Sequence, residues 1–138
     1  MKYLALTLLS GLAICSAVMA GDSMAPADAR VYIVSPSHGE VVSSPVKVVF
    51  GLSGMGVAPA GTKKDKTGHH HLLIDTAVPD LDKPIPADDH HKHFGGGQTE
   101  VSIELAPGKH TLQLLLADFA HVPHNPPVMS EQITITVK

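Results

Sequence analysis

Apolar and polar residues alternate with a period of two along most of the chain after residue 30. Within residues 45–52, for example, Val46, Val48 and Phe50 share one side of an extended chain. Stretches rich in proline and glycine separate such segments, and no segment has a helical period. The pattern predicts an all-β antiparallel sandwich in which each sheet has one wetted face. The expected strands, about seven, are residues 30–35, 45–52, 69–75, a weaker 81–85, 98–105, 109–117 and 131–137.

Two local patterns make the predicted sandwich immunoglobulin-like. The stretch "SPSHGEVVSSPVKV" resembles the first strand, turn and second strand of immunoglobulin-like modules. The stretches "PGKHTLQLLLAD" and "SEQITITV" resemble the last hairpin of the same fold, with a Pro-Gly turn before the penultimate strand.

The first twenty residues have the features of a secretory signal peptide. Lys2 is followed by an uncharged apolar stretch, and Val18 and Ala20 have the small-residue spacing of a cleavage site. A membrane anchor is the alternative, but a span needs about 20 apolar residues and polar residues interrupt this stretch. We expect a signal peptide at 1–20, a flexible leader at 21–29 and one domain at 30–138. The mature protein would then be periplasmic or secreted, with no membrane span.

Signal cleavage would change the composition in two useful ways. It removes Cys15, the only cysteine, so a mature chain of 118 residues has neither a disulfide nor a thiolate metal site. Nine basic and thirteen acidic residues remain, and this net charge of −4 argues against a nucleic-acid partner. All ten histidines are retained. Histidine is the commonest metal ligand, so composition directs attention to metal chemistry.

The predicted topology brings most of the histidines together. Successive connections of such a sandwich alternate between its two ends, so loops remote in sequence share an end. His38 and His110 fall at the opposite end from the rest. The eight expected at the common end are His69, His70, His71, His90, His91, His93, His121 and His124.

Spacing then selects candidate ligands. Residues two apart on a strand point to the same side, roughly 6.5–7 Å apart, so His69 and His71 can converge on one ion. His91 and His93 have the same spacing on an expected loop, while His70 should point toward the core. We predict a nitrogen-rich copper or zinc site. Its ligands would be His69, His71, His93 and His124, with His70, His90, His91, His121, Met55 and Met129 as further candidates.

Other residues of the same region suggest supporting roles. A methionine thioether would favour copper, especially Cu(I). Carboxylates often orient ligand rings, and Asp75, Asp89 and Asp118 are candidates for that role. The charged stretch "TKKDKTG" is interpreted as a solvated loop tip.

Several sequence blocks resemble a known family. "GMGVAPAG", "TGHHHLLID", "HFGGGQTE", "PGKHTLQLLLAD" and "VPH" together look like a family of small exported bacterial proteins catalogued only as a domain of unknown function. The resemblance covers about residues 31–138 and implies export and a single compact domain, with no activity attached. The paired histidines and glycines also resemble copper–zinc superoxide dismutases, although the disulfide typical of those enzymes is impossible here.

Three functions remain open from the sequence. The first is a periplasmic module that binds copper or zinc in metal handling or sensing. The second is a metal-free domain that binds another envelope protein, since sandwiches are common binding platforms. The third is a copper-dependent redox enzyme. A hydrolase is disfavoured because the chain has no serine in a nucleophile elbow and no usefully spaced carboxylate pair.

Overall fold

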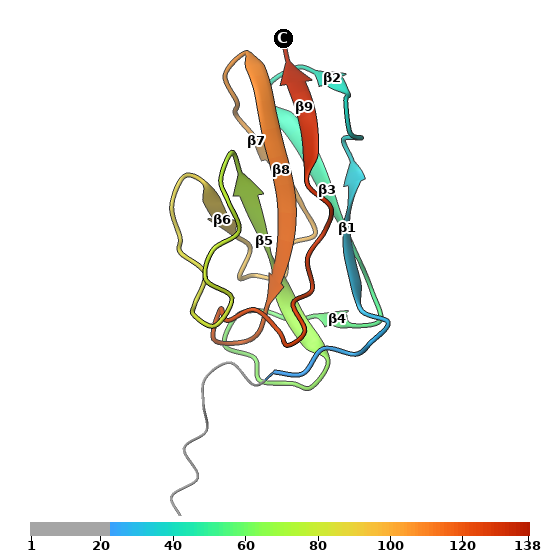
Figure 1. Ribbon diagram of the computed structural model, residues 1–138, viewed down its shortest axis with the longest axis vertical. Coiled ribbons are helices and arrows are strands. Elements are labelled where there is room, and N and C mark those ends of the chain that lie inside the picture. The colour runs from blue at the N-terminus through green and yellow to red at the C-terminus, as the bar shows by residue number, and fades with distance from the viewer. Residues whose placement is uncertain (1–22) are drawn as a thin grey trace, which may run out of the picture.

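A computed structural model describes residues 23–138, so the predicted signal peptide and residues 21–22 lie outside the described part. The chain forms a two-layer β-sandwich (Figure 1). Its strands are β1 Arg30–Ser35, β2 Val41–Val42, β3 Val46–Ser53, β4 Gly56–Val57, β5 Thr67–Ile74, β6 His91–His93, β7 Glu100–Ile103, β8 Gly108–Ala117 and β9 Ile133–Val137.

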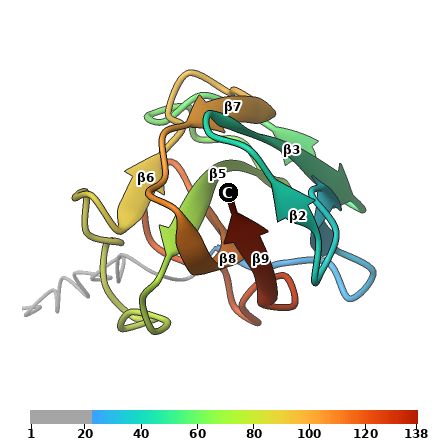
Figure 2. The same cartoon turned by 90° about the horizontal axis from the view of Figure 1, so that it is seen from above.

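One layer has three strands and the other has six. The order is β1-β3-β7 in the first sheet and β2-β9-β8-β5-β4 in the second, where β6 also pairs with β5. The view along the strands shows the two layers facing one another, with β6 at one side (Figure 2). Most neighbours are antiparallel, and only the short β2 and β4 pair in parallel. The predicted all-β sandwich is confirmed.

The main core lies between the sheets, where the period of two places it. Val46, Val48 and Phe50 of β3 are buried on the inner face of the first sheet. They pack in one cluster with the inward residues of the second sheet, among them Leu72 and Leu114. The alternation read from the sequence therefore selects the correct inner face of both sheets.

The outer face of the six-stranded sheet is also covered, although we expected it to be wetted. Leu73, Leu115 and Ala117 are buried there beneath Ile85, with Leu81 packed at the margin. The cover is the connection between β5 and β6, in which we predict a weaker strand at 81–85. That strand is wrong, because these residues form turns and irregular chain. Their apolar side chains fill an outer cluster instead of joining a sheet.

The described part of the predicted flexible leader, residues 23–29, packs against the sandwich. Ala25 donates a backbone hydrogen bond to Asn125 at 3.0 Å, and Asn125 donates one to Ser23 at 3.0 Å. Ala25 and Ala29 are buried in the main core. This segment therefore closes the end of the sandwich where the β8–β9 connection lies. Among residues 23–138, no helix is long and apolar enough to cross a membrane.

Candidate metal centre

Two alternate positions of β5 form the base of the histidine cluster. His69 and His71 alternate with His70, so they lie on the outer face of the six-stranded sheet while His70 points inward. Both are fully buried, at 0% and 1% exposure. Their ring centroids are 4.8 Å apart. The predicted convergence of this pair on one side of a strand is confirmed.

The third ring comes from β6. His93 is paired in register with His71, so the two side chains project from the same face. Their ring centroids are 5.1 Å apart. The expectation that His91 and His93 lie on a loop is wrong, because β6 adds a short antiparallel strand to the edge of β5. Strand pairing therefore aligns His93 with the β5 pair.

A glycine makes room for the His93 ring. A Cβ atom at Gly95 would overlap the ring, lying 2.6 Å from its Nε2 and closer still to its Cε1. Any larger residue at 95 would therefore displace the imidazole. This is a specific use for one glycine of the "HFGGGQ" stretch.

The fourth ring belongs to His121, in the connection between β8 and β9. Its backbone has a positive φ of 66°, and its N–H donates to the Asp118 carbonyl at 3.0 Å. The Asp118 carboxylate accepts from the N–H groups of Ala120 and Val122 and from the Ser23 hydroxyl. Asp118 therefore acts by fixing the turn that presents His121. It has no hydrogen bond to a ring of the cluster.

The four rings are close enough to share one ion. One ring nitrogen from each of His69, His71, His93 and His121 lies within 4.8 Å of the others. His69 Nε2 lies 3.1 Å from His121 Nδ1. An ion with bonds of about 2.0–2.1 Å needs nitrogens roughly 3.4 Å apart. Shifts of about an ångström in the wider pairs would satisfy that requirement.

Burial keeps the deepest rings neutral. Desolvation, with a smaller effect of His93 and His121, lowers the pKa of His69 to about 4. Desolvation and the same neighbours, together with His69, lower the pKa of His71 to about 3. Burial, then His121, also lowers the pKa of His93. Since metal binds only the neutral imidazole, these residues need not lose a proton first near pH 7.

Several buried nitrogens lack a hydrogen-bond partner within the described chain. They include Nδ1 of His69 and both ring nitrogens of His71. Leaving a buried polar group unpaired costs roughly 1–3 kcal/mol. A metal ion accepting a lone pair from each ring would remove part of this penalty. The donor set therefore fits an ion better than it fits an ordinary hydrogen-bonded cluster.

His124, one of the four favoured ligands, is absent from this group, and its place is taken by His121. The His124 ring is buried, and its Nε2 donates to the Thr67 carbonyl at 3.1 Å. It lies against Gly68, where an added Cβ would approach its Cε1 to 2.8 Å. His124 thus ties the β8–β9 connection to the start of β5.

The remaining histidines lie apart from the cluster. His70 is buried in the sandwich with its ring 5.1 Å from that of Phe50, and burial lowers its pKa to about 4. His90 Nδ1 lies 2.9 Å from the Ile74 carbonyl, and His91 Nδ1 lies 2.8 Å from Asp88. The eight histidines do not share one end, because β6 runs along the side of the sheet.

The other predicted ligands and supporting residues lie outside the cluster. Met55 is partly buried and packs against the main core. Met129 pairs with Leu115 by an isolated bridge and is 38% exposed. Asp75 binds His110 at 2.6 Å, and Asp89 binds Lys92 at 3.1 Å. None of these belongs to the group of four rings.

A sequence signal for His121 does exist. In "ADFAHVPH", Asp118 lies three residues before His121, a spacing suited to an aspartate-capped turn. Pro123 stiffens the chain just before His124, which made His124 the favoured candidate in place of His121. The two histidines are three residues apart in the sequence, and the geometry of the turn decides which of them reaches the other rings.

Comparison with known proteins gives a family and no activity. The model of the family DUF4399, described as a domain of unknown function, matches residues 48–138. That range contains all four rings of the cluster. No curated protein and no solved structure matches the chain significantly.

Proposed function

Because this chain belongs to DUF4399, a family without an assigned activity, we propose its function from the site: it is a metal-binding module that holds one copper(II) or zinc(II) ion. The ligands are His69, His71, His93 and His121. The module works in the periplasm or outside the cell, in metal handling or sensing.

One observation carries this proposal. Four imidazoles from three remote segments meet within 4.8 Å on the outer face of the second sheet. Two of them are fully buried with unpartnered nitrogens. A solvated histidine patch would have its nitrogens hydrated, so this burial is better explained by an ion.

The donor set supports divalent copper or zinc over Cu(I). All four donors are imidazole nitrogens, which suit Zn(II) and Cu(II). Cu(I) prefers sulfur, whereas the partly buried Met55 packs against the main core and not among the four rings.

The test is metal content and affinity of the mature protein. We expect one equivalent of Zn(II) or Cu(II) by elemental analysis after loading, and saturable binding by calorimetry. The double substitution His69→Ala and His71→Ala should reduce affinity at least a hundredfold. The control is His38→Ala, since the His38 ring accepts a hydrogen bond from the Thr134 N–H, away from the site.

Two results would overturn the proposal. One is absence of stoichiometric binding of either ion. The other is full affinity in the double variant while it remains folded by circular dichroism. A loaded protein that turns over superoxide or peroxide would point to the copper redox enzyme instead, and partner binding that survives chelation would point to the metal-free module.

A further inference from the structure

A short basic loop stands next to the candidate metal centre. We use this name for residues 62–66, which contain Lys63, Lys64, Asp65 and Lys66. All of them are exposed. Three lysines and one aspartate give the loop a charge of +2, whereas the whole chain has a net charge of −3. Positive charge is thus concentrated at one place on an otherwise acidic protein.

Hydrogen bonds attach the two residues just before this loop to the segments that contain His93 and His121. Ala60 donates to the Gly95 carbonyl at 2.8 Å, and Gly95 lies against the His93 ring. Gly61 donates to the Phe119 carbonyl at 2.9 Å, two residues before His121. The loop is therefore fixed beside the two ligands that do not come from β5.

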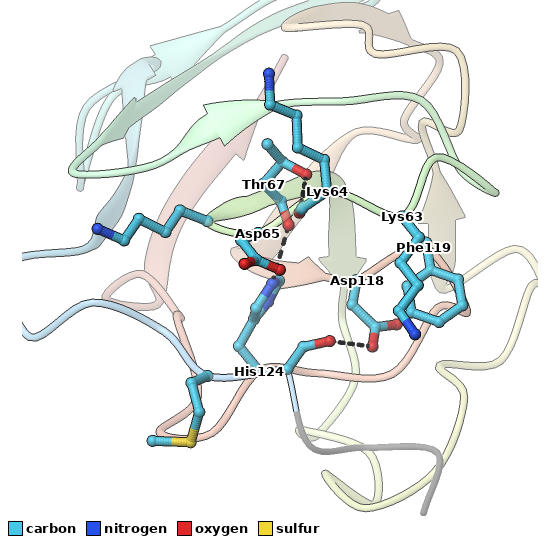
Figure 3. Close-up of a pocket in the computed structure, with 10 residues that line it drawn as sticks. Lys63, Lys64, Asp65, Thr67, Asp118, Phe119 and His124 are labelled. Carbon is cyan, nitrogen blue, oxygen red and sulfur yellow. Dashed lines mark hydrogen bonds between the residues drawn. The ribbon is translucent and has the colours of Figure 1, made fainter. Parts of the chain in front are cut away.

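A cavity of about 400 Å³ lies under the basic loop (Figure 3). The β8–β9 connection also lines this cavity, through Asp118, Phe119 and His124. Lys63 is held over the Phe119 ring, with Nζ 5.4 Å from the centroid, and Figure 3 shows it directed toward that ring. Lys64 extends outward in the same view.

Two carboxylates line this cavity, the exposed Asp65 of the basic loop and Asp118, and Asp118 is already satisfied. Asp118 is buried at 3% exposure and accepts three hydrogen bonds, from Ser23, Ala120 and Val122. Its oxygens are therefore committed to the turn. Among residues 23–138 none of the three lysines is in an ion pair, so their charge can attract an incoming anion.

Access to the metal centre is one-sided. His69 and His71 are fully buried and His121 is half-buried, while His93 is exposed. His93 is therefore the ring that an ion arriving from solvent meets first. Gly95, which lies against this ring, is hydrogen-bonded to Ala60, two residues before the basic loop, so the exposed ligand and the loop are neighbours.

We propose that the ion arrives as a small anionic carboxylate chelate, which the basic loop attracts and whose free carboxylates the cavity receives. This inference rests on the proposed metal-binding function. Loading is then a ligand exchange: metal–oxygen bonds to the carrier break, metal–nitrogen bonds to the histidines form, and the carrier leaves as an anion. The oxidation state of the ion does not change.

The experiment compares loading rates from two forms of one ion, zinc(II) or copper(II), whichever the titrations show to bind. The probes are its citrate complex and its aquo ion, mixed with protein by stopped flow at low salt. The test variant carries Lys63→Gln, Lys64→Gln and Lys66→Gln. The matched control carries Lys47→Gln, Lys109→Gln and Lys138→Gln, which change the net charge equally away from the loop.

Attraction by a local charge cluster raises association rates by 10- to 1,000-fold in favourable cases. We expect loading from citrate to slow about tenfold in the test variant and to change less than about twofold in the control. Loading from the aquo ion should not slow. The difference should shrink above about 0.5 M salt, where screening lengths fall to a few ångströms. Equilibrium affinity should stay the same.

Equal slowing by both triple variants would overturn the inference, since net charge alone would then explain the rates. Equal rates for wild type and the test variant would overturn it as well. In either case the metal still binds, so the proposed function stands. Absence of binding by the wild type removes the proposed function itself.

Discussion

At the residue scale, His121 and His124 show how closely spaced side chains acquire different roles. The two lie in one connection, yet His121 faces the outer sheet surface and His124 faces the start of β5. The positive φ at His121 turns the chain between them. A residue type and a spacing identify a candidate ligand, but a single backbone angle decides which candidate reaches the ion.

The two histidines should therefore respond differently to substitution. His121→Ala removes a ligand, so we expect metal affinity to fall at least tenfold by calorimetry. His124→Ala removes the hydrogen bond to Thr67 and leaves a cavity, so affinity should change less than about threefold while the free energy of unfolding falls by about 1–3 kcal/mol. The reverse pattern would restore His124 as the ligand.

Gly95 offers a second test that leaves every ligand in place. Gly95→Ala places a methyl group where the His93 ring lies, so the ring must move. We expect metal affinity to fall about tenfold, with little change in the melting temperature of the metal-free protein. Gly96→Ala is the matched control, since its new Cβ would meet only the end of the flexible Gln98 side chain, at 3.0 Å. Equal affinities in the two variants would show that the ring has other room.

At the element scale, the sequence pattern succeeds where a strand has one buried face. The first predicted strand, 30–35, coincides with β1, and the strand predicted at 109–117 differs from β8 by one residue. It fails for β6, because "HKH" contains no apolar residue to alternate. Pairing with the edge of β5 creates that strand. Such a long-range backbone interaction leaves no local signal.

The covering segment between β5 and β6 should contribute to stability through Ile85. This side chain is 6% exposed and packs on Leu73, Leu115 and Ala117. Replacing a buried isoleucine by alanine typically costs 2–5 kcal/mol. We expect Ile85→Ala to lower the free energy of unfolding in urea by about 2–3 kcal/mol. The control Val78→Ala changes a residue that is 37% exposed, so its effect should stay within about 0.5 kcal/mol.

The far end of the sandwich contains a pH-dependent link between β5 and β8. A hydrogen bond from His110 to Asp75, at 2.6 Å, raises the pKa of His110. The charged imidazole is thus favoured in the folded state. Its stabilising effect is complete below the ordinary histidine pKa near 6.5 and is lost as pH rises through the higher folded value.

We expect this link to contribute less than about 1 kcal/mol, because the pair is partly exposed. Denaturation at pH 5.5 and 8.5 should show that the difference in unfolding free energy between wild type and His110→Gln is larger at the lower pH. A constant difference across that range would mean that the pair is not titrating.

At the scale of the whole molecule, the pKa values of the cluster limit proton release on metal binding. Four ordinary histidines at pH 6.0 would release about three protons in total, given a pKa near 6.5. His69 and His71, with pKa values of about 4 and about 3, are already neutral at that pH. We expect clearly fewer than three protons per ion, measured by calorimetry in buffers of different ionisation enthalpy. A count near three would place the ligands elsewhere.

The overall architecture was predictable and the position of the site only in part. Alternation in segments such as 45–52 predicted both sheets and the main core, because a strand with one buried face has apolar residues at every second position. The same reasoning brought His69, His71 and His93 together. It placed them at an end of the sandwich, whereas they lie on the outer face of a sheet, because the edge strand β6 and the cover over Leu115 arise from pairings that alternation does not encode.

The inward direction of His70, between two outward rings, has a consequence for folding. If β5 paired with β8 one residue out of register, every side chain would exchange faces. Two imidazoles would then enter the hydrocarbon interior, and a single one would be left outside. A misregistered chain would thus lose its chelating pair and bury two polar rings at once. The strand alignment that avoids this burial is the same one that places the pair where it can hold an ion.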